Sequence, residues 1–420
     1  MQSRLGPAVT AFTIMALAGC SGTSQSSLTP GSGSLMPSAR SQPIVGVSHA
    51  HSPLTETVLY SFCQIASCAD GAFPTAGLTN VSGTLYGTTY YGGDAAYAGT
   101  VFSITASGEE TVVHSFGSGS DGTDPYGGLI NAGGTLYGTT HYGGGSSEYG
   151  TVFSVTPGGI YSLLRSFTWN DGANPWAGLA SVHGTLYGAT TVGGESGFGT
   201  IFSITKSGRY NTLYGFAKQG DCPFASMINV GGVLYGTTYS CNRPGHGNGT
   251  VFKITTSGTR TLLHRFAGGS DGARSGAPLT DVGGVLYGTT DYGGTGSCSA
   301  HHQSGCGTVF TIDPSTGAEA VLYSFKGGTD GVNPSGLTNV RGTLYGTTYY
   351  GGTGCKRKGC GTIFKITTSG TETVLHRFAG DSSDGQNPIG DLINLGGVLY
   401  GTTQNGGAHG WGTVFSLSGF

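Results

Sequence analysis

The sequence predicts an all-β protein, a seven-bladed β-propeller with four strands in each blade. Three observations lead to this fold class: one unit recurs seven times, each unit consists of short strand-like segments bounded by glycine, and the chain begins with the strand that its last unit lacks. Glycine supplies 82 of the 420 residues, where about 7% is usual. No Gly-X-Y triplet runs through the chain, which excludes a collagen-like protein. Disorder is excluded as well, since 22 Tyr and 19 Phe recur regularly and the net charge is only −3.

The repeat unit has four markers, each typical of a short β-strand. The first strand ends near Asn, as in Gly77-Leu-Thr-Asn80; the second contains Leu-Tyr-Gly-Thr/Ala-Thr, the third Gly-Thr-Val/Ile-Phe, and the fourth is an apolar run ending in Phe. The tyrosines of the second strand are Tyr86, Tyr137, Tyr187, Tyr235, Tyr287, Tyr345 and Tyr400. The phenylalanines that end the fourth strand are Phe62, Phe116, Phe167, Phe216, Phe266, Phe325 and Phe378. The segments show no sustained 3.6-residue period, and the glycine after each Tyr lets a neighbouring aromatic ring approach the backbone.

The order of the strands predicts that the units close into a ring. The body of the chain begins with a lone fourth strand, 57–62, and ends with the third strand of the last unit at Phe415–Leu417. The first segment therefore supplies the strand that the last unit lacks, and their pairing leaves no open edge. An open solenoid would instead need polar caps, which the sequence lacks.

The N-terminal residues predict export and lipid anchoring. A short charged start and an apolar stretch end in Leu17-Ala18-Gly19-Cys20, which resembles the lipobox of bacterial lipoproteins. We therefore expect a signal peptide at 1–19, lipidation of Cys20, a flexible Ser/Gly/Pro-rich tether at 20–54 and a propeller at 55–420. The alternative is an ordinary secretory signal with an incidental cysteine. The expected location is the bacterial cell envelope, with a monomer anchored in the outer membrane and facing either the periplasm or the exterior.

The repeated units resemble those of the GloVer-type tandem-repeat (choice-of-anchor) family. Its members carry Leu-Tyr-Gly-Thr-Thr, Gly-Gly and Gly-Thr-Val-Phe units behind varied export or anchoring signals, and the resemblance covers about residues 55–420. The resemblance implies an exported β-propeller, and it supplies no catalytic residues to transfer.

The cysteines indicate an oxidising compartment. Besides Cys20, eight cysteines form four pairs that are close in sequence: Cys63/Cys68, Cys222/Cys241, Cys298/Cys306 and Cys355/Cys360. In an exported chain such pairs predict disulfides. The alternative is a zinc site at Cys298 and Cys306 with His301 and His302, although adjacent histidines do not easily converge on one ion. We expect no metal and no other cofactor.

The two ends of the blades differ in sequence variability. The turns between first and second strands and between third and fourth strands are nearly constant hairpins, whereas the other connections are longer and variable. We therefore expect function on the variable-loop face. Two series recur in every unit: an Asp in each fourth-to-first connection of this face, and an Asn, Ser or Asp before each first hairpin at the opposite end. Both predict turn capping rather than a ligand site.

Aromatic residues that break the repeat are the candidate ligand-binding residues. They are Trp169, Trp176, Tyr126, Tyr142, Tyr292, Tyr350 and Trp411. Such rings stack on sugars or grip peptides. The alternative is that they plug the channel or pack between blades.

The function predicted is that of a non-enzymatic binding or scaffold module for a polysaccharide, peptide or protein. The chain carries 18 basic against 21 acidic residues, which excludes the basic stripe of a nucleic-acid binder. It contains no Gly-x-Ser-x-Gly, His-Glu-x-x-His or P-loop motif. Two alternatives remain: a propeller enzyme, a lyase or hydrolase acting on extracellular polysaccharide, and a purely structural envelope protein.

Overall fold

The computed structural model describes residues 53–94, 97–117, 119–217, 222–239, 247–300, 303–355 and 358–420. The predicted signal peptide, Cys20 and nearly all of the predicted tether lie outside these residues. Within them the protein is all-β, with three short 3₁₀ turns, η1 (Ala66–Cys68), η2 (Gly145–Ser147) and η3 (Gly269–Asp271). None of the described segments forms a helix of the length and hydropathy that a bilayer crossing requires.

Seven antiparallel sheets, which we call blades 1 to 7, make up the unit Pro53–Phe420. Blade 1 contains β2 (Ala72–Pro74), β3 (Thr79–Val81), β4 (Thr84–Tyr91), β5 (Thr100–Ile104) and β6 (Glu110–Ser115). Blades 2 and 3 contain β7 (Ile130–Asn131), β8 (Leu136–Thr140), β9 (Thr151–Val155), β10 (Tyr161–Ser166), β11 (Ala180–Val182), β12 (Thr185–Thr190), β13 (Thr200–Thr205) and β14 (Tyr210–Gly215).

The remaining blades follow the same order. Blades 4 and 5 contain β15 (Ile228–Val230), β16 (Val233–Thr238), β17 (Thr250–Ile254), β18 (Arg260–Arg265), β19 (Thr280–Val282), β20 (Val285–Thr290), β23 (Thr308–Ile312) and β24 (Glu319–Ser324), with β21 (Ser299–Ala300) and β22 (Gln303–Ser304) as a separate hairpin. Blades 6 and 7 contain β25 (Val332–Val340), β26 (Thr343–Tyr350), β27 (Thr362–Thr367), β28 (Glu372–Arg377), β29 (Gly385–Leu395), β30 (Val398–Gly406), β31 (Thr413–Ser418) and β1 (Thr55–Ser61). The predicted seven-bladed propeller is confirmed.

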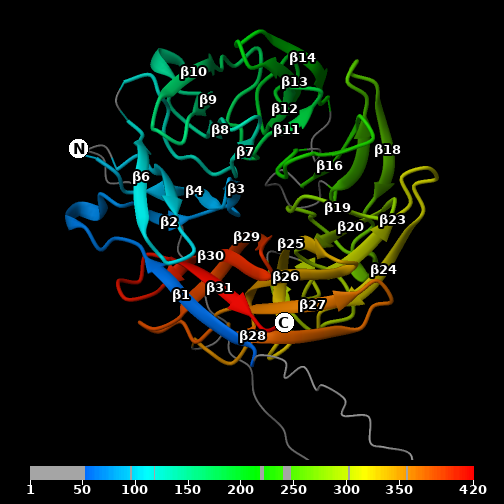
Figure 1. The fold of residues 1–420 in the computed structure, drawn as a ribbon. Helices are drawn as coiled ribbons and strands as arrows, with labels where there is room; N and C mark the ends of the chain where they lie inside the picture. The colour runs from blue at the N-terminus through cyan, green and yellow to red at the C-terminus, as the bar shows by residue number, and fades with distance from the viewer. Residues whose placement is uncertain are drawn as a thin grey trace, which may run out of the picture. The chain divides into compact units, whose positions relative to one another are not determined.

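The ring closes as the strand order predicts. β1 pairs with β31, so the first strand of the body completes the sheet β1-β31-β30-β29. The hydroxyl of Thr402 in blade 7 also donates to the carbonyl of Ala76 in blade 1, at 2.9 Å. Figure 1 shows the first strands, such as β3, β7 and β29, near the centre and the fourth strands, such as β6, β10 and β28, at the outside.

Phenylalanine pairs form the core at every blade junction. The Phe that ends each fourth strand meets the Phe of the next blade's third strand edge-on, with ring centroids 5.0–6.1 Å apart. The pairs are Phe62/Phe102, Phe116/Phe153, Phe167/Phe202, Phe216/Phe252, Phe266/Phe310, Phe325/Phe364 and Phe378/Phe415. The marker glycine makes this packing possible, because a Cβ at Gly87 would lie 2.5 Å from Cζ of Phe102. This confirms the role predicted for the glycine after each tyrosine.

The repeated Asn series caps the first hairpin, as predicted, at five of its seven positions, and among the described residues no such bond joins Ser181 or Asn394 to its hairpin. Oδ1 of Asn80 accepts the backbone N–H of Gly83 at 2.8 Å. The same bond, at 2.9–3.0 Å, joins Asn131 to Gly134, Asn229 to Gly232, Asp281 to Gly284 and Asn339 to Gly342. These residues therefore hold the constant hairpins.

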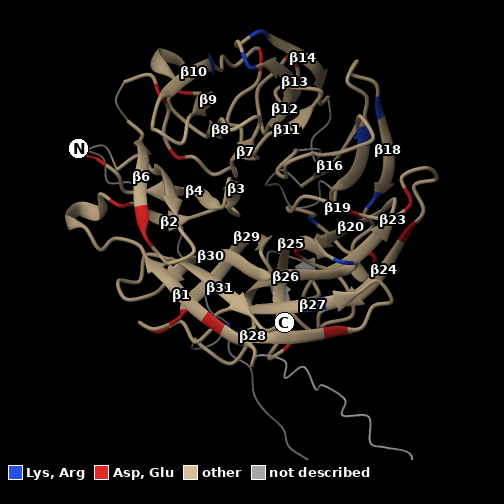
Figure 2. Ribbon diagram, viewed as in Figure 1, with Lys and Arg blue, Asp and Glu red and all other residues tan. Residues whose placement is uncertain are grey.

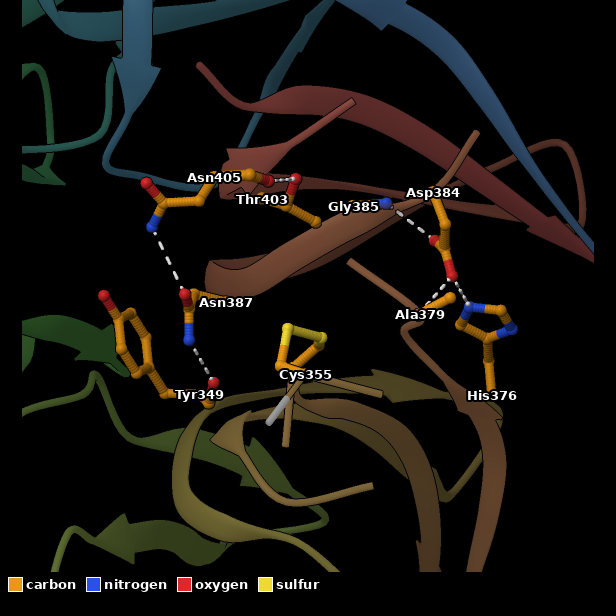
Figure 3. Close-up of a disulfide and its surroundings, with 10 residues drawn as sticks. Tyr349, Cys355, His376, Ala379, Asp384, Gly385, Asn387, Thr403 and Asn405 are labelled. Atoms are coloured by element: carbon orange, nitrogen blue, oxygen red, sulfur yellow. Dashed lines mark hydrogen bonds and ion pairs between the residues drawn. A yellow bond between two sulfur atoms is a disulfide. The ribbon is translucent and has the colours of Figure 1, made fainter. Parts of the chain in front are cut away.

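Three of the predicted disulfides are present: Cys63–Cys68, Cys298–Cys306 and Cys355–Cys360. Cys222 is disulfide-bonded too, while its predicted partner Cys241 lies outside the described residues. The zinc alternative at Cys298 and Cys306 is wrong, because the two sulfurs are bonded to each other. Figure 3 shows the Cys355 disulfide close to the connection that contains Ala379 and Asp384. A Cβ at Gly380 would lie 2.4 Å from Sγ of Cys360, so the disulfide packs tightly against this connection.

Candidate functional site

The variable-loop face carries all the connections between second and third strands and between fourth strands and the next blade. The antiparallel order of each sheet places these connections at one end of the blade and the constant hairpins at the other. The variable-loop face has two zones, an outer rim at the fourth strands and an inner ring around the centre.

A cavity of about 420 Å³ lies away from this face. Its lining residues Ser203, Thr205, Arg209, Tyr210 and Asn211 belong to the β13–β14 hairpin and its turn. The lining repeats the hairpin pattern of the other blades, so we do not assign function to it.

The outer rim is built from a repeated aspartate that binds backbone N–H groups. Asp70 accepts the N–H of Gln64 at 2.9 Å and the hydroxyl proton of Tyr60 at 2.8 Å. In the other described connections, Asp121, Asp171, Asp271, Asp330 and Asp384 each accept a backbone N–H at 2.5–3.1 Å. Each also contacts a fourth-strand side chain: His114, Arg165, His264, Tyr323 and His376, respectively. The predicted capping role is confirmed for these six; Asp221 lies outside the described residues.

Four glutamates reach these aspartates from the next blade. They are Glu56, Glu110, Glu319 and Glu372, each near the start of a fourth strand; Figure 2 shows acidic segments on β6, β24 and β28. Burial, and secondly the charge of the neighbouring aspartate, raise the pKa of all four to about 7. Oε1 of each is buried without a hydrogen-bond partner. A carboxyl group in this position is therefore protonated below about pH 7.

Two rim junctions bring three potential metal ligands within 4.8 Å of one another. One group is Glu56, His376 and Asp384, and the other is His264, Asp271 and Glu319. In both, the aspartate oxygens already accept backbone N–H groups, so we assign the groups to the junction rather than to an ion.

The inner ring combines two positions of each unit. One is the residue that follows Thr-Thr or Ala-Thr of the second strand. The other is the residue that follows the proline of the fourth-to-first connection, or the aligned residue in the unit that has no proline there. The first set is Tyr90, His141, Thr191, Tyr239, Asp291, Tyr349 and Gln404. The second set is Thr75, Tyr126, Trp176, Phe224, Gly276, Ser335 and Ile389. Unlike the rim, these positions change in chemistry from blade to blade.

Aromatic rings fill the inner ring from blade 1 to blade 4. Tyr126 stacks on Tyr90 at 4.7 Å and on Trp176 at 4.1 Å between ring centroids. Trp176 continues to Phe224 at 5.3 Å, and Phe224 to Tyr239 at 5.2 Å. Tyr126 and Trp176 therefore cover one face of each other's ring. For these two candidates this favours the alternative that they pack between blades.

His141 lies edge-on to Tyr126 and Trp176, at 5.3 and 5.0 Å. Burial lowers the pKa of His141 to about 4, so this imidazole is neutral at neutral pH. His141 therefore adds an uncharged aromatic ring to the row of aromatic side chains in the inner ring.

Every exposed Tyr, Phe or Trp side chain among the described residues lies in blades 1 and 2 or in the connection that follows blade 2. These residues are Tyr91 (37% exposed), Tyr97 (38%), Tyr142 (46%) and Trp169 (45%), which we call the aromatic sector. The rings of Tyr91 and Tyr97 stack with their centroids 5.4 Å apart. Tyr142 contacts His141 of the inner ring, with the centroids 4.3 Å apart. Trp169 and Tyr142 were predicted as candidates from the sequence, which also indicates Tyr91 as a loop aromatic of this face, whereas Tyr97 was missed.

The other predicted candidates lie elsewhere on the variable-loop face. Trp411 packs on Phe73 at 4.8 Å, and Tyr350 meets Tyr349 at 4.7 Å. Tyr292 is buried, with the guanidinium carbon of Arg274 5.4 Å from its ring centre. The structure therefore does not bring the seven candidates into one site.

A polar cluster at the junction of blades 4 and 5 was not predicted. The hydroxyl of Tyr239 donates to Oδ2 of Asp291 at 2.9 Å. Burial raises the pKa of Asp291 to about 7, while this hydrogen bond and the charge of Arg274 act in the opposite direction. The signal was present in the sequence, because Arg274 and Asp291 depart from the residue types of the other units.

A second acidic departure, Asp391, faces Gly336. Asp391 stands where the other units have Gly, Ser or Pro, and its Oδ1 is buried without a hydrogen-bond partner. Burial raises its pKa to about 7. A Cβ at Gly336 would overlap this carboxylate, so Gly336 is the residue that leaves room for it.

The sequence profile of the Gloeobacter/Verrucomicrobia repeat matches residues 45–243, 98–301, 142–356 and 295–419, which together span the propeller. The chain belongs to this repeat family. The resemblance drawn from the tandem units is thereby confirmed. A search of curated proteins gave no match.

Solved structures similar to this family member include two lyases. An oligogalacturonate lyase in complex with manganese has a TM-score of 0.54 at 11% identity, over 87% of this chain and 96% of the other. An oligogalacturonate lyase from Vibrio parahaemolyticus has a TM-score of 0.51 at 8% identity, with the same coverage of 87% and 96%. A putative 6-phosphogluconolactonase from Bacteroides uniformis has a TM-score of 0.50 at 16% identity, over 78% and 89%. At such identities the likeness shows the fold alone.

Proposed function

We propose that this protein is a lipid-anchored extracytoplasmic module that binds polysaccharide through its aromatic sector. The observation that carries the proposal is that Tyr91, Tyr97, Tyr142 and Trp169 are the exposed aromatics of the described chain and share one side of the variable-loop face. Exposed rings held by a rigid scaffold are suited to stacking on the apolar faces of sugar rings.

The surroundings of the sector favour a neutral sugar. Around Tyr91, Tyr142 and Trp169 the connections carry Gly, Ser, Thr and Asn, with few charged side chains. A ligand there gains from stacking and hydrogen bonds rather than from ion pairing.

The test is affinity gel electrophoresis of the full chain against neutral soluble polysaccharides such as β-glucan, xylan, mannan and dextran. We expect retardation by at least one polymer, and Trp169→Ala should weaken it about tenfold, as truncation of a central aromatic does. Ile160→Ala is the matched control, because Ile160 is an exposed apolar residue in a hairpin turn of the opposite face. Retardation that survives Trp169→Ala and Tyr142→Ala would refute the proposal.

The anchoring part rests on the motif Leu17-Ala18-Gly19-Cys20. Stable membrane attachment takes more than one acyl chain or one chain with a second signal, and a lipidated N-terminal cysteine supplies several acyl chains. Cys20→Ser should move the protein from the membrane fraction to the soluble fraction. Its persistence in the membrane fraction would contradict the anchor.

A second candidate function is that of a polysaccharide lyase or hydrolase. The specific observation in its favour is the hydrogen bond from Tyr239 to Asp291 next to Arg274, since a carboxyl group with a raised pKa is suited to acid or base catalysis. Incubation with extracellular polysaccharides distinguishes the two functions: new reducing or unsaturated ends that disappear in Asp291→Asn would favour the enzyme.

A further inference from the structure

The junction of blades 4 and 5 concentrates departures from the repeat. Arg274 stands where three other units have Asn, Ser275 replaces the proline, Gly276 replaces an inner-ring side chain, and Asp291 is the acidic member of its set. Since the repeat specifies the fold at the other junctions, four departures at one place indicate a local requirement other than folding.

Arg274 occupies a backbone conformation that suits asparagine better. Its φ is +60°, as at Asn174, Asn333 and Asn387, which have φ of 54–58°. Those asparagines donate their side-chain amide to a second-strand carbonyl of the preceding blade, at 2.7–3.1 Å. An arginine in the left-handed region is strained relative to asparagine, and such strain is typical of functional sites.

The guanidinium of Arg274 lies within cation–π distance of two tyrosine rings. Its central carbon is 5.6 Å from the ring centre of Tyr239 and 5.4 Å from that of Tyr292. Nε is buried and makes no hydrogen bond. The two rings hold the group in place and leave this donor unused.

Gly276 leaves one position of the inner ring without a side chain. The positions aligned with it in blades 2 to 4 carry Tyr126, Trp176 and Phe224. A Cβ at Gly276 would lie 3.4 Å from the Tyr239 ring and 3.9 Å from Oδ1 of Asp291. Gly276 is exposed, so no side chain of this position covers the polar cluster.

The carboxyl group of Asp291 is oriented toward Gly276 by its other contacts. Oδ2 accepts the hydroxyl proton of Tyr239 at 2.9 Å, so Oδ1 is the oxygen closer to Gly276. Next to it, Ser275 is 0% exposed and its hydroxyl has no hydrogen-bond partner. A fully buried hydroxyl without a partner is uncommon and points to a polar group that is missing from this place.

These groups fit one class of ligand. A guanidinium pairs with a carboxylate in a planar, bidentate geometry. A carboxyl group and a phenol exchange hydrogen bonds with hydroxyls, and an aromatic ring covers an apolar sugar face. A sugar acid offers all three features on one ring.

We propose that the junction of blades 4 and 5 is a subsite for a carboxylate-bearing sugar residue, with Arg274 binding its carboxylate and Asp291 and Tyr239 its hydroxyls. The subsite rests on the proposed polysaccharide-binding function and adds an acidic residue to the neutral chain bound by the aromatic sector. It does not depend on Trp169 or Tyr142.

The experiment is saturation-transfer NMR and titration calorimetry of the full chain with sodium D-glucuronate, and with D-glucose as the neutral match. Glucuronate should bind at least tenfold more tightly than glucose. Arg274→Asn introduces the residue that three other units have, keeps the backbone conformation and should abolish this preference. Gly276→Phe, which copies Phe224, should block both sugars, and unchanged melting temperatures show that both variants are folded.

The outcomes separate this inference from the proposed function. Glucuronate binding that is absent, equal to that of glucose, or unchanged in Arg274→Asn overturns the subsite, even if neutral polysaccharides still bind through Trp169. Conversely, neutral polysaccharide binding that ignores Trp169→Ala overturns the proposed function, while a glucuronate preference lost in Arg274→Asn still supports the subsite.

Discussion

The outer rim and the inner ring carry the same sevenfold repeat. They differ in what happens where one unit has another residue than the rest. At the rim, Glu110 and Tyr161 occupy equivalent positions, and each reaches the loop aspartate region of the preceding junction: Glu110 lies beside Asp70, and the hydroxyl of Tyr161 donates to the carbonyl of Asp121 at 2.8 Å. One side chain replaces another while the junction stays filled. In the inner ring, Gly276 stands where the preceding three blades carry an aromatic residue, and a Cβ there would make only ordinary contacts, with the Tyr239 ring and Oδ1 of Asp291. Where another side chain makes up for a changed residue, the position has a structural role. Where none does, we infer a position on a binding surface.

The largest effect on stability should come from adding a side chain where the inner strands pack too closely to accept one. A Cβ at Gly178 would lie 2.5 Å from the carbonyl oxygen of Gly128 in the neighbouring blade, whereas one at Gly276 makes only ordinary contacts. Gly178→Ala should lower the free energy of unfolding by about 1–3 kcal/mol, and Gly276→Ala by little. Urea denaturation checks both; equal midpoints for the two variants would contradict the distinction between closed and open positions.

The next effect is on pH dependence and concerns the rim alone. The pKa of Glu319 is about 7 in the folded protein, against 4.5 as its ordinary value, because burial and Asp271 raise it. The folded protein therefore binds more protons between these values, so this contribution to stability is present below about pH 4.5 and is lost as the pH rises through 7.

The rim prediction is tested by comparing melting temperatures across this pH range. Glu319→Gln should gain stability relative to wild type as the pH rises from about 4.5 to 7, since the amide has no proton to lose. Glu148→Gln, at an exposed glutamate, is the control and should show no such trend. A constant difference between Glu319→Gln and wild type would exclude a protonated carboxyl group at the junction.

The sequence predicted the blade number, the ring closure and the rim because these depend on signals repeated within each unit. Asp70 and Asn80 act on N–H groups a few residues away, and the disulfide Cys298–Cys306 closes a local loop, so spacing was sufficient. Arg274 and Asp291 were visible as departures, but their contact with Tyr239 depends on how two blades pack. Tyr239 and Asp291 are 52 residues apart, and sequence spacing says nothing about such a pair. The sequence could not decide whether Tyr126 and Trp176 bind a ligand or stack on one another, because this too depends on how neighbouring blades pack.

A smaller effect is expected at the constant hairpins. Asn80→Ala removes one exposed hydrogen bond to Gly83 and should cost about 0.5–1.5 kcal/mol. Polysaccharide retardation should be unchanged, because the hairpins lie at the opposite end of the blades. A loss of binding in folded Asn80→Ala would place ligand contacts on the wrong face.

Hydrogen–deuterium exchange with and without a retarded neutral polysaccharide tests most directly whether the aromatic sector is the binding surface. We predict protection confined to the connections that contain Tyr91, Tyr97, Tyr142 and Trp169, with the hairpins and the outer strands β18 and β28 unchanged. Protection centred on the hairpins or on the outer strands, with the four aromatic connections unaffected, would contradict the account.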